Sequence, residues 1–378
     1  MNNKYIIIFI CISILICMLI KLNTSPHHKI SFFKTNALVP LNRPFCNIYD
    51  NNGNLLNITL LSRPFWLKSQ YDDYETKVKG KFIVFGISSY QEFPNEPINP
   101  KDNYNKTTNR YDKDKWLNMC IGWLHCFRNP DYYLPLSMDK INLSESDFCD
   151  CNVNKPNPSI KKKYDFMYIC HRDDLSDCSV NEWVAFNKNL ELAEKCITQV
   201  CNKNKNIKGL LIGRFDCNIP QGCSHVQIET TKKLSYNDLQ KRYDESKLLF
   251  CPNIHDASPR VITEALSHNI PCLVNKNIVG GWKYIISGET GEFFEDETDF
   301  YPQFTKVLSN CKSYKPREYF IKHYGIISSG RKMKNFLYDT IEKQSHKLNI
   351  KVNIPKEDID YICPEFKKIN IESCKLKY

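Results

Sequence analysis

The chain has 378 residues and a formal net charge of +10, and 42% of its residues are hydrophobic, 12% aromatic and 25% charged. This length predicts two domains, each with its own core, and the aromatic content excludes a disordered chain. The 13 glycines and 19 prolines exclude a collagen-like or low-complexity protein. Lysines are scattered and form no basic stripe interleaved with aromatic residues, so no nucleic-acid partner is expected.

An apolar run of 16 residues, from Tyr5 to Ile20, lies near the N-terminus between Lys4 and Lys21. As a helix it spans roughly 24 Å, enough for a thin membrane. The residues that follow lack the small-x-small pattern of a cleavage site, although a cleaved signal peptide is the alternative. We therefore expect a single-pass anchor within residues 1–22. Because the segment before it is short, a type II orientation is expected, with the globular part in an endoplasmic reticulum or Golgi-like lumen.

The 18 cysteines include no CxxC pair and no Cys/His set at zinc spacing, so no structural metal is expected. A lumenal domain permits disulfides. Cys217 and Cys223 are the nearest plausible pair, although spacing alone does not determine the connectivity.

The first half of the chain gives weak signals after the apolar run. Residues 23–45 are polar and contain several prolines, which is typical of a stem. Residues 46–163 predict an N-terminal α/β domain with few clear strands. Asn52-Gly53 is a strong hairpin signal, and Lys81–Ser89 has the composition of a buried strand.

Residues 164–310 alternate between short apolar strands and amphipathic helices. The expected strands are 165–170, 207–213, 225–230, 248–252 and 271–275. Ser179 and Glu182 form a capping box before a helix whose apolar face carries Phe186, Leu190, Ala193, Ile197 and Val200. Ser235 begins a second helix, and Pro259 opens a third that runs to about His268. This alternation predicts a parallel sheet covered by helices on both faces.

Residues 311–378 predict one more amphipathic helix, followed by a basic tail. The apolar face of this helix carries Met333, Phe336, Leu337 and Ile341.

The residues that indicate chemistry are concentrated in Leu248–Phe294. A strand ends at Pro252, and Ser258-Pro259 is typical of the cap and first position of a helix. Ligands of open parallel sheets bind outside the carboxyl ends of the strands. A helix that starts there offers free N–H groups and a partial positive charge to a phosphate, and Arg260 adds a charge-assisted contact.

Two carboxylates flank this expected phosphate position. Glu264 lies on the same helix, roughly 130° from the centre of its apolar face and about 9 Å from the cap, which suits a contact with ribose hydroxyls. Asp256 precedes the helix and is placed to contact a sugar beyond the diphosphate. The alternative is that Glu264 is an ordinary solvated helix carboxylate and Asp256 a loop-turn residue.

This segment resembles the nucleotide-sugar site of GT-B glycosyltransferases, in particular family 4, the glycosyl transferases group 1. The pattern of that family is an acidic residue, a Glu-Ala pair after seven further residues, a small-residue–Pro–Val turn, a Gly-Gly pair and a G-x-T-G-x-F/L-F segment. The chain has Asp256, Glu264-Ala265, Ile270–Leu273, Gly280-Gly281 and Gly288–Phe294. The resemblance covers about residues 164–305. It implies an α/β fold of GT-B type, in which two Rossmann-like domains face each other across a cleft, with the N-terminal one reduced.

The resemblance also implies an enzyme, a hexosyl- or pentosyltransferase. It would move a sugar from a nucleoside-diphosphate donor to a hydroxyl of a glycan, protein or lipid, without a metal or other cofactor. Asp256 maps to the sugar-contacting acid and Glu264 to the ribose-binding one. The candidate donor-binding residues are Arg172, Lys188, Ser258, Arg260, Gly280 and Gly281. The interval from Arg172 to Lys188 is wider than usual in the family, so a merely solvated lysine is the alternative at Lys188.

Some features depart from this pattern. The first acid is Asp where Glu is commoner, and Ser258–Arg260 also resembles inverting exostosin-like enzymes, although the G-x-T-G segment favours the retaining family 4. His125 is a candidate catalytic residue because some family members place a histidine there; a core histidine is the alternative. The triplet Asp112–Asp114 matches a metal-binding D-x-D but lies in a polar loop with no strand before it. A catalytically silent carbohydrate-binding relative is the competing function.

Overall fold

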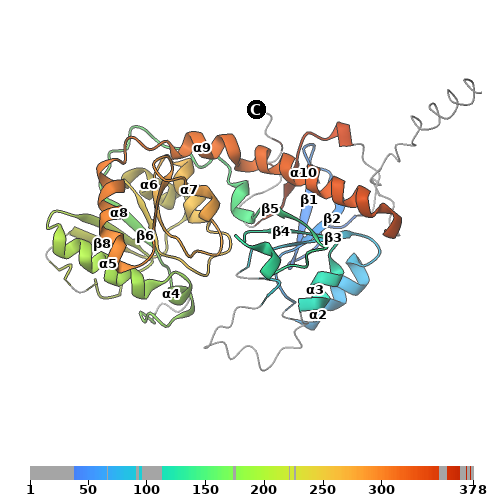
Figure 1. The fold of residues 1–378 in the computed structure, drawn as a ribbon, viewed down its shortest axis with the longest axis horizontal. Helices are drawn as coiled ribbons and strands as arrows, with labels where there is room; N and C mark the ends of the chain where they lie inside the picture. Colours follow the sequence, from blue (N-terminus) through green and yellow to red (C-terminus); the bar gives the residue numbers. More distant parts are fainter. Residues whose placement is uncertain are drawn as a thin grey trace, which may run out of the picture.

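The computed structural model describes residues 38–65, 67–90, 93–95, 113–172, 176–220, 222–224, 227–348, 356–366, 372 and 375. They form two α/β domains that lie side by side, each built on a six-stranded sheet (Figure 1). The expected membrane anchor and most of the expected stem lie outside the described residues. Within the described part of the chain, no helix combines the length and apolar character needed to span a bilayer.

The N-terminal domain contains more strands than its sequence indicates. Its sheet has the order β12-β1-β2-β3-β4-β5. The strands are β1 (Phe45–Asp50), β2 (Leu55–Leu61), β3 (Ile83–Ile87), β4 (Gly122–His125), β5 (Asp139–Asn142) and β12 (Ile362–Pro364). The predicted hairpin is confirmed: β1 and β2 pair antiparallel, and Gly53 takes the positive φ of 82° that the turn requires. Strands β2 to β5 are parallel.

Helices from both ends of the chain cover the N-terminal sheet (Figure 1). On one face lie α2 (Lys68–Asp73), the π-helical turn η1 (Tyr74–Val78) and α3 (Lys113–Met119), around a core that includes Trp116 and Trp123. Lys113 and Asp114 of the Asp112–Asp114 triplet lie in α3, and Asp112 lies outside the described residues. The other face is covered by α10 (Gly325–Gln344), the predicted C-terminal helix, whose Met333, Leu337 and Ile341 are buried there.

The C-terminal segment is thus part of the N-terminal domain. Beyond α10 the chain forms β12, which pairs antiparallel with β1. The chain crosses between the domains twice, once before β6 and once after α9. These two passages lie together, because a Cβ on Gly325 would be 3.4 Å from Cys151 Sγ and 3.6 Å from the Cys149 carbonyl oxygen.

The C-terminal domain has the predicted parallel sheet covered on both faces. Its strand order is β11-β10-β9-β6-β7-β8, and all neighbours are parallel. The strands are β6 (Phe166–Ile169), β7 (Lys208–Ile212), β8 (Gln227–Thr231), β9 (Leu249–Cys251), β10 (Cys272–Asn275) and β11 (Gly291–Phe294). One apolar cluster packs α5 (Leu190–Lys203) and α8 (Glu297–Ser309) on one face. Another packs α6 (Tyr236–Glu245), α7 (Arg260–Ser267) and α9 (Pro316–His323) on the other.

The helix expected after Ser179 is divided into two. Glu182 caps α4 (Trp183–Asn187) by accepting a hydrogen bond from Ala185 N, and Asn189 then adopts a left-handed φ of 52° before α5. Asparagine tolerates this conformation better than most residues. Phe186, expected on the buried face, is 38% exposed, whereas Leu190, Ala193, Ile197 and Val200 are buried as predicted. The cap at Ser235 is confirmed, since its hydroxyl accepts from Asp238 N at 3.2 Å.

The suggested Cys217–Cys223 pair is wrong. Cys217 is instead bonded to Cys178, and Cys223 to Cys201. Cys217 and Cys223 both lie in the segment after β7, but each faces a different neighbour: Cys178 precedes α4, and Cys201 lies in the last turn of α5. Sequence proximity therefore gave the wrong partners.

The remaining short helices are η3 (Pro130–Tyr132), η4 (Glu145–Phe148), η5 (Trp282–Tyr284), η6 (Ser345–Lys347) and η7 (Lys356–Asp358). Of these, η4 and η5 lie where the two domains meet.

Candidate functional site

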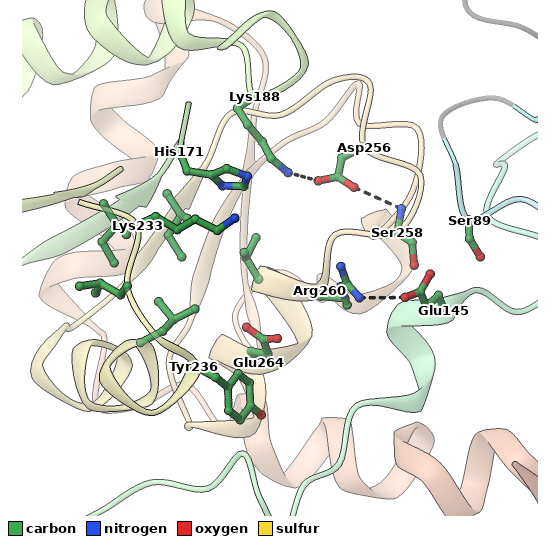
Figure 2. A pocket seen from close by; sticks show the side chains of 15 residues that line it. Ser89, Glu145, His171, Lys188, Lys233, Tyr236, Asp256, Ser258, Arg260 and Glu264 are labelled. Atoms are coloured by element: carbon green, nitrogen blue, oxygen red, sulfur yellow. Dashed lines mark hydrogen bonds and ion pairs between the residues drawn. The ribbon is translucent and has the colours of Figure 1, made fainter. Parts of the chain in front are cut away.

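A cavity of about 440 Å³ lies at the carboxyl edge of the C-terminal sheet. Ile169 and Ile212, the last residues of β6 and β7, form part of its wall, and Lys233 and Asp256 follow β8 and β9. Ser89 and Glu145 reach it from the N-terminal domain, so both domains line the cavity (Figure 2). Its size and position are those of a small-molecule site in an open α/β sheet.

Lys188 and Asp256 form an ion pair at one end of this cavity (Figure 2). Asp256 also accepts hydrogen bonds from Asn253 Nδ2 at 3.1 Å and from Ser258 N at 3.3 Å. Burial opposes the charge of the Asp256 carboxylate, but Lys188 and these hydrogen bonds outweigh burial and lower its pKa. Burial likewise opposes the charge of Lys188, and Asp256 outweighs it and raises the lysine pKa. Both groups are therefore charged at neutral pH.

The start of α7 is one residue later than expected, and this changes the role of Ser258. Pro259 is the N-cap and Arg260 the first helical residue. The Ser258 hydroxyl does not cap the helix; it accepts from Ser146 N at 2.7 Å and donates to Ser146 Oγ at 3.0 Å. Arg260 Nη1 donates to Glu145 Oε1 at 2.8 Å. Both side chains line the cavity and contact η4 of the N-terminal domain.

Glu264 lies one turn further along α7 and lines the cavity, as its position on the helix predicts. It is only 3% exposed and accepts a hydrogen bond from Tyr243 OH at 3.1 Å. Burial, followed by the charge of Glu264, raises the pKa of Tyr243, so this phenol remains a neutral donor. Glu264 is therefore a buried, positioned acceptor, and the solvated alternative is wrong.

Gly280 and Gly281 are not among the residues that line the cavity; they support the loop that does. Gly280 N donates to the Asp256 carbonyl oxygen at 2.9 Å, and a Cβ at this position would lie 1.9 Å from the Ala257 carbonyl oxygen. Gly281 has a φ of 85°, and its Cβ would lie 2.3 Å from Pro259 Cγ. Only glycine permits this approach, so the pair holds Asp256–Pro259 in place.

The structure does not place Arg172 in the cavity wall. Its guanidinium is buried against the disulfide loop, with Nη1 3.2 Å from Cys178 Sγ and Nη2 3.8 Å from Asp216. The preceding residue, His171, lines the cavity instead. Sequence reasoning missed His171 together with Lys233, Tyr236 and Glu145. All four follow the carboxyl end of a strand, which is the one signal that would have found them.

His125 ends β4 and is also absent from the described cavity wall. Its side chain is 5% exposed and stacks on Phe127, with ring centroids 6.2 Å apart. Burial, reinforced by the positive charges of Lys283 and Lys140, lowers its pKa to about 4. Its imidazole is therefore neutral at pH 7. The neighbouring Arg128 donates to the Lys276 carbonyl oxygen at 2.9 Å and so joins the two domains.

Comparison with known proteins agrees with this geometry. Residues 184–323 match the family model described as Glycosyl transferases group 1. The matched range contains Lys188, Asp256 and Glu264, and it confirms the resemblance predicted from the motifs. No curated protein sequence matches the chain.

Solved structures show the same architecture at low sequence identity. The lipopolysaccharide outer core galactosyltransferase WaaB in its apo form is 13% identical, with a TM-score of 0.51 over 75% of each chain. Sucrose-phosphate synthase from Thermosynechococcus elongatus is 11% identical, with a TM-score of 0.52 over 75% of this chain and 74% of the other. The pneumococcal O-GlcNAc transferase GtfA, in complex with UDP and GlcNAc, is 8% identical, with a TM-score of 0.50 over 72% of this chain and 55% of the other. These likenesses concern the fold, which is α/β with two Rossmann-like sheets.

Proposed function

We propose that this chain, with its two Rossmann-like domains, is a glycosyltransferase that transfers a sugar from a nucleoside-diphosphate donor to a hydroxyl acceptor. The observation that carries this proposal is the cavity at the carboxyl edge of the C-terminal sheet. Its lining combines the start of α7 with the cations Lys188, Lys233 and Arg260 and the carboxylates Asp256 and Glu264. The acceptor, whether glycan, protein or lipid, would enter from the N-terminal domain.

In this proposal each part of the donor has its own contact. The ribose hydroxyls donate to Glu264, which Tyr243 holds in place. The diphosphate lies at the start of α7, between Lys188 and Arg260. The transferred sugar then reaches Asp256, whose lowered pKa keeps it an acceptor of hydrogen bonds from sugar hydroxyls.

The chemistry follows from the charges around the diphosphate. When the glycosidic bond breaks, negative charge accumulates on the leaving diphosphate, and fixed cations stabilise it most at that moment. Lys188 and Arg260 supply that charge, so the proposed reaction needs no metal. Closure of the two domains around the donor would exclude water and favour transfer over hydrolysis. Retention of the anomeric configuration is proposed from the resemblance to family 4.

The proposal is tested with the purified chain and a panel of nucleotide sugars in a thermal-shift assay. A donor that binds the folded protein raises its melting temperature by mass action. We expect donors of one class to raise the melting temperature of the wild type and to leave that of Glu264→Gln unchanged. Glu229→Gln is the control, because Glu229 pairs with Lys163 and Arg242 outside the cavity. Absence of any shift would contradict the proposal.

A catalytically silent relative is the second candidate, favoured by one observation. Both Ser258 and Arg260, which the proposal assigns to the donor, are held by Ser146 and Glu145. Incubation of the wild type with the donor found in the panel separates the two functions. Release of free nucleoside diphosphate by the wild type but not by Asp256→Asn supports the enzyme, and binding without release supports the silent relative.

We further propose that the globular part is lumenal and anchored by residues 5–20. The apolar run supports the anchor, and the two disulfides support an oxidising compartment. Expression with microsomes tests both points. We expect the protein to resist carbonate extraction and to be protected from added protease. Extraction into the supernatant would contradict the anchor, and digestion without detergent would contradict the orientation.

A further inference from the structure

Glu145 belongs to the N-terminal domain but reaches the proposed donor cavity. It is the first residue of η4, which follows β5, and its carboxylate lies 2.8 Å from Arg260 Nη1 (Figure 2). Its side chain is 17% exposed and that of Arg260 is 35% exposed. Arg260 is the first residue of α7. A carboxylate therefore lies beside the cation and the helix start to which the proposed function assigns the diphosphate.

The next residue of η4 makes a second contact of the same kind. Ser146 N donates to Ser258 Oγ at 2.7 Å, and Ser258 Oγ donates to Ser146 Oγ at 3.0 Å. Two consecutive residues of one domain thus engage the side chains on both sides of Pro259. The Ser258 hydroxyl and the Arg260 guanidinium therefore contact the N-terminal domain, although both side chains also line the cavity.

Asp147 fixes the position of this turn. It is fully buried and accepts from Lys283 Nζ at 2.6 Å and from Tyr284 OH at 2.7 Å. Its carbonyl oxygen accepts from Ser329 Oγ on α10 at 2.8 Å. Both domains hold η4 through Asp147. This short helix therefore fixes the position of Glu145 beside Arg260.

Resting on the proposed function, we propose that Glu145 competes with the donor diphosphate for Arg260 and thereby sets the affinity of the site. A carboxylate and a phosphate beside one guanidinium repel each other, and the guanidinium can pair fully with only one. A partly exposed ion pair is weak, so a diphosphate can displace Glu145. Donor binding then turns the Arg260 guanidinium from Glu145 to the diphosphate, while Asp147 keeps η4 in place.

The experiment measures the dissociation constants of UDP, GDP, ADP and CDP by calorimetry with the full chain. The substitution Glu145→Gln removes the charge and keeps the shape, so the nucleotide that binds the wild type should bind this variant roughly three- to tenfold more tightly. Asp360→Asn is the matched control, because Asp360 forms an exposed pair with Arg331 in the same domain at 2.7 Å, away from the cavity. The control should bind like the wild type.

A double-variant comparison separates competition from a change in overall charge. With Arg260→Ala, adding Glu145→Gln should give no further gain in affinity, because the contested cation is gone. If Glu145→Gln fails to fold, Glu145→Asp serves in its place; its shorter carboxylate draws back from Arg260, and an intermediate gain is expected.

Weaker or unchanged nucleotide binding by Glu145→Gln, with wild-type binding intact, overturns the competition and leaves the proposed function standing. A gain of equal size in the Arg260→Ala background also overturns it. If none of the four nucleotides binds the wild type or the variant, the proposed function fails, and this inference fails with it.

Discussion

Lys188 and Asp256 show how much the site depends on single side chains. Each would be costly to bury alone, and each keeps its charge through the other. The pKa of Asp256 is lowered, so its contribution to stability is complete above the unfolded value near 3.9 and is lost at lower pH. The pKa of Lys188 is raised, so its contribution is lost as the pH rises beyond about 10.4. The pair therefore stabilises the site throughout the physiological range.

The proposed role of Lys188 on the diphosphate gives the first prediction. Lys188→Met should lower kcat/KM for sugar transfer at least about 100-fold, or about 2.7 kcal/mol, because the leaving diphosphate loses a fixed cation. Lys195→Met is the control, since Lys195 forms an exposed pair with Glu191 on α5. Steady-state kinetics measure both variants. A Lys188→Met enzyme as active as the control would remove Lys188 from the mechanism.

His125 gives a prediction about pH. Its pKa of about 4 lies below the unfolded value of 6.5, so the unfolded chain binds more protons between these values. Stability should therefore fall by roughly 3 kcal/mol as the pH drops from 7 to 4 through this residue alone. Denaturant unfolding of wild type and His125→Asn across this range measures the effect. We expect a shallower slope in the variant; identical slopes would show that His125 titrates normally.

At the scale of elements, the loop between β9 and α7 depends on the chain behind it. Asp256, Ser258 and Arg260 are brought to one side of the cavity because Gly280 and Gly281 let two backbone segments approach closely. The shape of this loop is thus determined by residues about 24 positions later, which gives the Gly-Gly pair a supporting role although neither glycine lines the cavity.

Gly280→Ala tests this dependence. The new Cβ would meet the Ala257 carbonyl oxygen at 1.9 Å, so the loop has to move. We expect roughly tenfold or greater loss of nucleotide affinity, with a lower melting temperature. Gly80→Ala is the control: it has a positive φ but no neighbour within 4 Å, so it should lower stability slightly and leave binding unchanged. Equal nucleotide affinity in the two variants would contradict the supporting role.

At the scale of the whole molecule, each domain is completed by parts distant in sequence. The N-terminal sheet receives both its edge strand β12 and its covering helix α10 from the end of the chain. The C-terminal domain is built from one continuous stretch. The two domains should therefore respond separately to changes in α10.

Leu337→Ala tests this separation. Leu337 is fully buried on α10, so truncating it should cost about 2–5 kcal/mol in the N-terminal domain. Hydrogen exchange should accelerate in β1 to β5 and stay unchanged in β6 to β11. Uniform acceleration throughout the chain would show that the two domains unfold as one unit.

These particulars show what could be predicted from the sequence. The parallel C-terminal sheet was predictable because its strands and helices alternate in order along the chain, although its central pairing of β6 with β9 joins residues about 80 positions apart. The helical period placed Glu264 off the apolar face of its helix, and the family resemblance favoured a site residue over a solvated carboxylate. The N-terminal sheet could not be completed, because β12 pairs with β1 across more than 300 residues and has only three residues of its own. Arg172 was predicted because the resembled family has an arginine after this strand, whereas the structure places the preceding residue, His171, in the cavity wall.

The two passages of the chain between the domains lie against each other at Cys149–Cys151 and Gly325. Two adjacent connections can act as a hinge. They permit rotation of one domain relative to the other about the connected edge and resist twisting and sliding. On the cavity side this rotation is limited by η4, because Asp147 bonds Lys283 and Tyr284 of the C-terminal domain. Cleavage of the chain in one connection would loosen this hinge, but the two domains would remain covalently joined through the other.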